Sequence, residues 1–193
     1  FPYTTLFRSQ EAIGEADRLL GIFSALLSIA EAEAGTLQRS FQKVALADIA
    51  RQIADLYEPA AEEAGLAFVS DIRAEPVVLG NQQLLAQAVA NLLDNALKYS
   101  PPGGRVTLAV EGPDGARGTC ISVSDGGPGI PADQRETVLR RFVRLESSRS
   151  SPGNGLGLSL VDAVARLHGA RLEMDDNRPG LIVAIVFPRI DAG

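Results

Sequence analysis

Apolar residues recur at helical spacing in several stretches of the chain. From Gln10 to about Ala34 they fall mostly three and four residues apart, which predicts an amphipathic helix. Its apolar stripe is wide, as is typical of a helix in a bundle, and Gly35 follows as a helix C-cap. Further helices are predicted at residues 46–64, 81–99 and 156–167, with a shorter one ending near 142. The alternative for the first stripe is a lone helix packed on the domain that follows.

Short stretches of alternating or continuous apolar residues predict strands between these helices. They lie at residues 41–45, 66–72, 77–79, 105–111, 118–124, 170–175 and 181–187. Clusters of proline and glycine, such as residues 101–104, separate them. The mixed order of helices and strands predicts an α+β fold, an α/β sandwich with a sheet on one side.

Composition narrows the possible chemistry. A length of 193 residues suits one domain with an appendage, and a net charge of -6 without a long run of one sign argues against binding to nucleic acid. A single cysteine, Cys120, and a single histidine, His168, exclude an internal disulfide and a cysteine or histidine metal cluster. They fit a reducing, cytoplasmic compartment. The longest apolar stretch, residues 19–30, is too short to span a bilayer, so no membrane contact is expected.

The first nine residues, FPYTTLFRS, resemble the translation of a widely used sequencing adapter. They are therefore interpreted as a non-native leader and set aside from the fold prediction. Native sequence then begins near Gln10. The alternative is a native N-terminal tail.

One predicted helix contains the sequence NLLDNALKY at residues 91–99. Asn91 and Asn95 are four residues apart, so their amides share a helix face, with Asp94 and Lys98 at neighbouring spacings. Amide and carboxyl oxygens suit Mg²⁺, and a lysine can meet a phosphate as a point charge. A solvated helix face is the alternative. The opposite face is apolar and expected to be buried, with Leu85, Val89, Leu92 and Ala96.

Two glycine-rich loops follow further along the chain. In DGGPGI, residues 125–130, three glycines let the backbone pass close to a ligand, and ionised Asp125 can accept from an exocyclic amine such as that of adenine. In GNGLGL, residues 153–158, bare N–H groups precede a predicted helix and can bind an anion. The spacing matches neither the dinucleotide fingerprint nor a Walker loop. The alternatives are a tight surface turn for the first loop and a flexible hinge for the second.

The order of these motifs resembles the ATPase fold shared by histidine kinases, type II topoisomerases, mismatch-repair ATPases and a heat-shock chaperone family. The sequences of these motifs are most similar to those of the sensor histidine kinases, and the sequence LRRFVR at residues 139–144 is similar to that family's F box. The resemblance implies a Bergerat ATP-binding fold, a two-layer sandwich with a mixed sheet packed on about three helices and preceded by one bundle helix. It assigns residues 10–38 to the second helix of a truncated dimerisation and histidine-phosphotransfer hairpin, and residues 39–190 to an ATP-binding catalytic domain.

The resemblance also implies roles for individual residues. Asn95 would be the main Mg²⁺ ligand with support from Asn91, and Lys98 would touch the phosphates. Asp125 would bind the adenine amine. The other residues expected to bind ATP are Tyr99, Gly127, Gly129 and Ile130 around the base, and Arg144, Gly153, Gly155, Leu156, Gly157 and Leu158 around the phosphates.

In that family the γ-phosphoryl group of ATP passes to a histidine on a dimerising helix hairpin, then to an aspartate of a response regulator receiver domain. The resemblance therefore implies a protein histidine kinase of a two-component system, a phosphoprotein that uses ATP and Mg²⁺ and whose parent is a homodimer, compatible with an inner-membrane anchor. The acceptor histidine is expected upstream and is missing here, so no catalytic residue is assigned and autophosphorylation is not expected. His168, at a helix end, is interpreted as structural.

Two other functions remain open at this point. One is a serine kinase or ATPase of the same fold, against which the helical stripe before Gly35 speaks. The other is a nucleotide-binding scaffold that has lost catalysis. The retained asparagines, Asp125 and the glycines speak against a scaffold, although they argue for binding more directly than for turnover.

Overall fold

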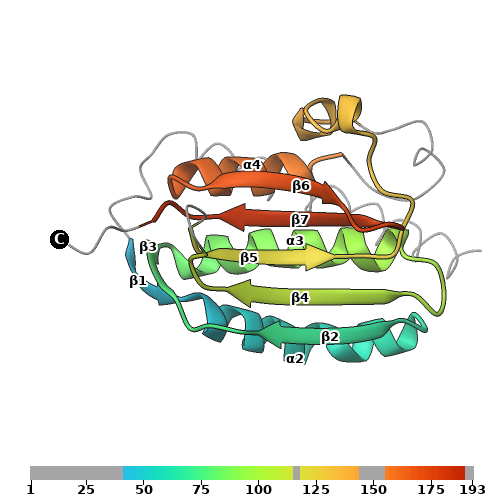
Figure 1. Ribbon diagram of the computed structural model, residues 1–193, viewed down its shortest axis with the longest axis horizontal. Helices are drawn as coiled ribbons and strands as arrows, with labels where there is room; N and C mark the ends of the chain where they lie inside the picture. The colour runs from blue at the N-terminus through green and yellow to red at the C-terminus, as the bar shows by residue number, and fades with distance from the viewer. Residues whose placement is uncertain (1–40, 115–117, 144–154, 190–193) are drawn as a thin grey trace, which may run out of the picture.

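The protein folds as two layers, a sheet and a set of helices packed on one of its faces (Figure 1). The computed structural model describes residues 41–114, 118–143 and 155–189. The predicted leader at 1–9 and the bundle helix at 10–38 lie outside these ranges. The described helices are α2 (Leu46–Glu63), α3 (Gln82–Tyr99) and α4 (Gly157–Leu167). The described strands are β1 (Gln42–Ala45), β2 (Ala67–Ile72), β3 (Val77–Gly80), β4 (Arg105–Glu111), β5 (Cys120–Ser124), β6 (Arg171–Asp176) and β7 (Leu181–Val186).

The main sheet is mixed, with the strand order β2-β4-β5-β7-β6. β2 and β4 are parallel, which is possible because β3 and α3 lie between them in the sequence and form the crossover. The other three pairs are antiparallel, and β1 and β3 form a separate antiparallel pair. The predicted fold class, a mixed sheet on about three helices, is confirmed.

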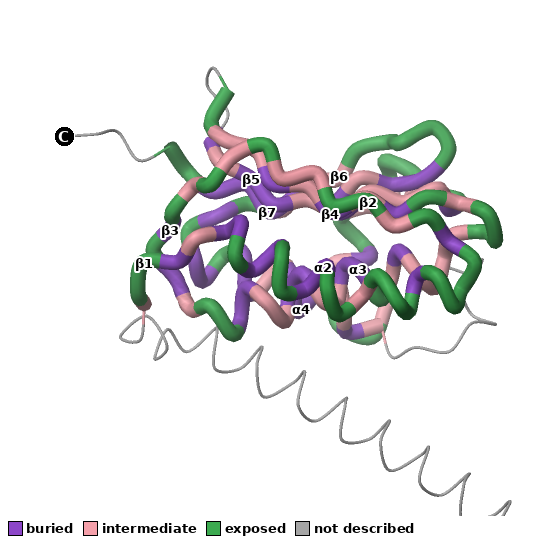
Figure 2. Tube along the Cα trace, turned by 90° about the horizontal axis from the view of Figure 1, so that it is seen from below, coloured by how far each residue is buried: buried purple, intermediate pink, exposed green. Residues whose placement is uncertain are grey.

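The core lies between the sheet and the three helices (Figure 2). Along β4, Val106, Leu108 and Val110 are fully buried while the residues between them are not, as period-two alternation requires. The predicted apolar face of α3 is also buried, at Leu85, Val89, Leu92 and Ala96. Burial of each large apolar side chain contributes about 1.5–3 kcal/mol. This packing fixes the rotation of α3 about its axis and therefore the direction of its polar face.

The start of α3 is set by its cap. The side chain of Asn81 accepts a hydrogen bond from the Leu84 N–H at 3.1 Å, and asparagine is among the residues preferred at this position. The helix ends at Tyr99, where Ser100 is extended ahead of two prolines. Both ends of the helix that carries Asn91 and Asn95 are therefore determined locally.

The stretch before residue 142 differs from the prediction of one short helix. It forms two 3₁₀ turns, η2 (Ala132–Gln134) and η3 (Thr137–Leu139). Val138 is the only buried residue of either turn, so the segment has too few apolar positions to hold a continuous helix against the domain.

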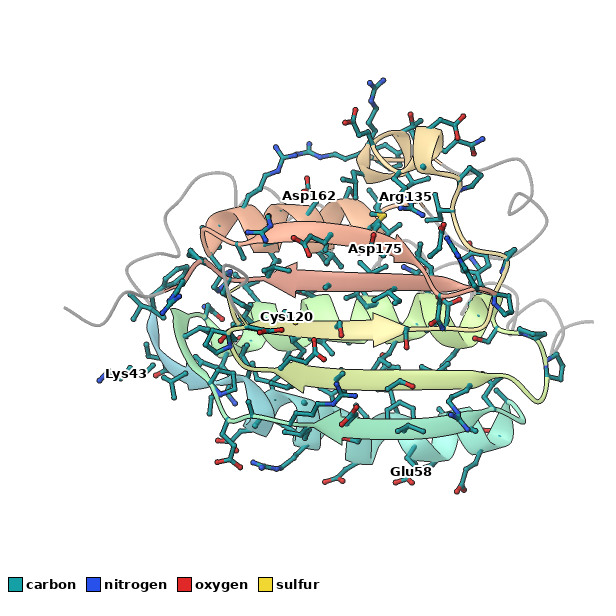
Figure 3. The ribbon with its side chains drawn as sticks, in the orientation of Figure 1. Lys43, Glu58, Cys120, Arg135, Asp162 and Asp175 are labelled. Carbon is teal, nitrogen blue, oxygen red and sulfur yellow. The ribbon has the colours of Figure 1, made fainter. Side chains whose placement is uncertain are left out.

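Cys120 is a small buried residue that packs with Ala184 and Val186 on the outer face of the sheet (Figure 3). Among the described residues, no helix has the length and apolar character needed to cross a membrane.

Candidate functional site

The polar face of α3 meets the start of α4. A β-carbon added to Gly157, the first residue of α4, would lie 3.4 Å from Asn91 Oδ1 and 3.4 Å from Asn95 Nδ2. Asn91 donates its own amide hydrogen to the Gln87 carbonyl at 2.8 Å, which turns its Oδ1 toward Gly157. Since Gly157 has no side chain, both amides face open backbone at the N-terminus of a helix, where anions bind readily. The N-cap residue of this helix, Leu156, makes no capping hydrogen bond with its own side chain.

The end of α3 adjoins the first glycine-rich loop. A β-carbon at Gly127 would lie 2.8 Å from the carbonyl oxygen of Tyr99, so any larger residue there would push the loop away from the helix. Lys98 donates to the Tyr99 hydroxyl at 2.9 Å, and its ammonium lies 4.5 Å from the centre of the Tyr99 ring. Both side chains are partly exposed, which leaves them able to contact a ligand.

Asp125 lies where β5 ends and the loop begins. Its carboxylate accepts from the Gly127 N–H at 2.7 Å, and its own N–H donates to the Leu181 carbonyl at 2.9 Å. Burial raises the pKa of the Asp125 carboxyl, while hydrogen bonds from the backbone of Gly127 and Leu181 partly lower it again. A desolvated carboxylate at a strand end is suited to accept from a donor on a flat base.

The hairpin between β6 and β7 supports the same loop, and sequence reasoning missed its role. The Asn177 amide donates to the Asp125 carbonyl at 2.7 Å, and Gly180 lies against that carbonyl. On the other side of the loop, Arg135 donates to the Ile130 carbonyl at 3.1 Å. The sequence Asn-Arg-Pro-Gly signals a turn, but nothing in it indicates a contact with a residue 52 positions earlier.

The remaining predicted residues are distributed along the same end of the molecule. Gly129 has a φ of 72° and would place a β-carbon 3.0 Å from the Gly180 carbonyl. Gly155 has a φ of 67°, and its carbonyl accepts from the Phe142 N–H at 2.9 Å. Leu156 is buried and Leu158 is partly buried against the core. Arg144 and Gly153 lie outside the described residues.

Asp94 does not join the two asparagines, although its spacing placed it near them. Its carboxylate accepts from the Tyr57 hydroxyl of α2 at 2.7 Å, and the same hydroxyl lies 3.2 Å from the Ala90 carbonyl. This network joins α2 to α3. Asp94 is thereby assigned to helix packing.

These elements come together at one end of the sheet, on the right of Figure 1, where β5 and β6 end and where β7 and α4 begin. Amide oxygens, a lysine and a helix N-terminus suit phosphates with Mg²⁺, and Asp125 with the glycines suits a base. Among the described residues, no group of three or more His, Cys, Asp and Glu could hold a metal ion. The amide oxygens of Asn91 and Asn95 would fit a magnesium ion whose remaining ligands are phosphate and water oxygens.

The comparisons with known proteins agree with this arrangement. The family model described as "Histidine kinase-, DNA gyrase B-, and HSP90-like ATPase" matches residues 80–191. The solved structure of a mycobacterial sensor histidine kinase, MprB, is 33% identical, with a TM-score of 0.65, and the match covers 77% of this chain and 97% of that one. The chain belongs to the sensor histidine kinases.

A second solved structure, that of full-length ShkA in complex with AMPPNP, is 28% identical with a TM-score of 0.77. That match covers 91% of this chain and 36% of ShkA. Among curated relatives, the signal transduction histidine-protein kinase/phosphatase MprB of Mycolicibacterium smegmatis is 48% identical over 103 residues. The matched part is 53% of this chain and 21% of that relative, so this sensor histidine kinase chain spans about a fifth of the relative's length. It contains the ATP-binding catalytic domain, as the motifs predicted.

Proposed function

We propose that the domain binds ATP with Mg²⁺ between α3, the loop at 125–130 and the start of α4. We further propose that it donates the γ-phosphoryl group to a histidine on a dimerising helix hairpin. From there the group passes to an aspartate of a response regulator receiver domain. The observation that carries the proposal is the position of Asn91 and Asn95 against the glycine that begins α4.

In this proposal the two halves of the nucleotide are bound by different elements. Asn95 and Asn91 hold Mg²⁺, which neutralises charge on the phosphates. Lys98 and the N–H groups at the start of α4 contact the phosphates, together with Gly155, Leu156 and Leu158. Asp125 accepts from the adenine amine, and the base lies along Tyr99, Gly127, Gly129 and Ile130. Arg144 and Gly153 are still predicted to lie near the phosphates.

In this proposal the acceptor histidine is not His168. The chain's only histidine, His168, is buried, and its Nε2 accepts from the Asn81 N–H at 3.0 Å. Its Nδ1 lies 2.7 Å from the Val164 carbonyl, so both ring nitrogens are occupied. The proposal includes two-component signalling by a parent protein that is a homodimer and a phosphoprotein.

The test is a calorimetric titration of the chain with ADP, with and without Mg²⁺. We expect micromolar affinity, a binding free energy of about -8 kcal/mol, that weakens when Mg²⁺ is omitted. Asp125→Asn should abolish most of the binding. Asp94→Asn is the matched control, because it makes the same change on α3 at a carboxylate that contacts Tyr57.

The second step is to supply a histidine-bearing hairpin of a sensor histidine kinase together with ATP labelled at the γ-position. Label on the hairpin histidine supports the proposal. Failure of the folded chain to bind ADP would refute it and favour a nucleotide-free scaffold. ATP hydrolysis without any transfer to histidine would favour an ATPase of the same fold.

A further inference from the structure

The loop at residues 125–130 is held at both ends by one hairpin. β6 and β7 are joined by the turn at residues 177–180, in which the Asn177 N–H donates to the Gly180 carbonyl at 3.1 Å. Two side chains link the loop to this hairpin, Asn177 at one end and Arg135 at the other. Neither has a direct contact with nucleotide in the proposed function.

At the near end, Asn177 fixes the backbone of Asp125. Its amide donates to the Asp125 carbonyl at 2.7 Å, while the Asp125 N–H is bonded to the Leu181 carbonyl at 2.9 Å. The peptide groups on either side of the Asp125 α-carbon are therefore both tied to the hairpin. The direction in which the Asp125 side chain leaves the backbone is set by these two bonds.

At the far end, one guanidinium bridges the loop and the edge strand. Arg135 Nε donates to the Ile130 carbonyl at 3.1 Å, and its Nη1 donates to the Met174 carbonyl at 2.8 Å. Its Nη2 pairs with Asp176. Because β6 is an edge strand, the Met174 carbonyl is free to accept from outside the sheet. The Arg135 side chain is 20% exposed and lies at the β6 edge, near Asp175 (Figure 3).

The geometry points to Arg135 and Asn177 as positioning residues for adenine recognition, an inference that rests on the proposed function. Asn177 holds the half of the loop with the carboxylate, and Arg135 holds the glycine half against the same hairpin. The Gly127 N–H connects the halves through its bond to the Asp125 carboxylate. If either end is released, the glycine half of the loop moves relative to the Asp125 carboxylate. The carboxylate and the glycines are then no longer aligned together with the adenine base.

The test compares the affinities of ADP and IDP, because inosine has a carbonyl oxygen where adenine has its amine. Arg135→Gln and Asn177→Ala should each weaken ADP binding by about tenfold and IDP binding by less than about threefold, since the lost interaction is directed to the amine. Asp125→Asn should remove the preference for ADP. The matched control is Arg171→Gln, a change on the same β6 strand at an arginine that pairs with Glu173.

The outcomes separate this inference from the function on which it rests. If the wild-type chain shows no preference for ADP over IDP, adenine recognition by Asp125 is wrong. If Asp125→Asn loses the preference while Arg135→Gln and Asn177→Ala keep it, the positioning roles are refuted. An equal loss of both nucleotides in those two variants also refutes them, because it indicates a general loss of structure.

Milder variants cover the case in which these proteins unfold. Arg135→Lys keeps a cation for Asp176 but cannot bridge two carbonyls with a planar fork, so an intermediate loss of preference is expected. Asn177→Ser shortens the donor at the near end and should give a similar intermediate result. Wild-type preference in both folded milder variants overturns the inference.

Discussion

Gly180 and Asp125 lie so close that their contact excludes any side chain at position 180. A β-carbon on Gly180 would lie 1.8 Å from the Asp125 carbonyl oxygen, and the φ of Gly180 is 117°. Backbone with this φ is essentially restricted to glycine. The hairpin turn can therefore approach the end of β5 only because residue 180 has no β-carbon.

Gly180→Ala is expected to destabilise the protein by about 3 kcal/mol, because it adds a clash with backbone to a strained φ. Gly65→Ala is the control, since Gly65 also has a positive φ, 70°, but has no atom within 4 Å of the added carbon. It should cost about 1 kcal/mol. Urea unfolding measures both, and equal costs would contradict the role of this contact.

The affinity for ADP should fall as the pH is lowered, and the fall should begin above the usual range of an aspartate. Burial raises the pKa of Asp125. The ionised carboxylate is a better hydrogen-bond acceptor for the adenine amine than the protonated carboxyl group. An ordinary aspartate titrates near about 3.9. Calorimetric titrations at several pH values measure the effect.

The Asp125→Asn variant provides the control for that pH dependence. Its residual ADP binding should not change over the same pH range, because the titrating group is gone. At neutral pH it should also unfold at a temperature no lower than that of the wild type, because folding no longer buries an ionised carboxylate. A strong loss of stability would mean that Asp125 is mainly structural.

Acid should weaken the protein through His168. Burial lowers its pKa, with a smaller opposing effect from the bond to the Val164 carbonyl, so the folded state favours the neutral ring. The contribution of neutral His168 to folding stability is complete above the pKa of histidine in the unfolded state, about 6.5. It is lost as the pH falls through the lower pKa of His168 in the folded state. A proton on Nε2 would face the Asn81 N–H and remove that bond.

His168→Gln tests this assignment. The variant should be less stable at pH 7.5 by about 2 kcal/mol, because it loses the bonded ring and its stacking on Phe41 at 4.7 Å. The difference from wild type should shrink between pH 6.5 and pH 5. A constant difference across that range, measured by urea unfolding, would show that His168 does not titrate in this window.

Gly157→Ala should weaken nucleotide binding while leaving the stability of the protein nearly unchanged. The added carbon makes ordinary contacts of 3.4 Å with Asn91 and Asn95, and alanine favours a helix, so the unfolding free energy should change by less than about 1 kcal/mol. The methyl group fills the space between the amides and the start of α4, so ADP affinity in the presence of Mg²⁺ should drop by about tenfold. Unchanged Mg²⁺-dependent binding would place the metal elsewhere.

Much of the fold was predictable because the signals are local. Apolar spacing and turn residues within short windows indicate how α3 is rotated and where the strands that line the core lie. They also indicate the cap at Asn81. The motifs at 91–99, 125–130 and 153–158 identified the nucleotide-binding family in the same way. The short helix before residue 142 was wrong because apolar residues there are too sparse for spacing to decide.

The supports of the loop were decided only by the tertiary structure. Asn177 lies 52 positions from Asp125, and Arg135 lies 39 from Met174, so no local pattern links them. Their contacts exist because β7 pairs with β5 and leaves β6 at the sheet edge. Asp94 shows the same limit, since helical spacing placed it near Asn91 and Asn95 but could not reveal Tyr57 on α2 as its partner. The sequence determined which residues could bind a nucleotide, whereas the order of the strands and the packing of the helices determined which residues hold them in place.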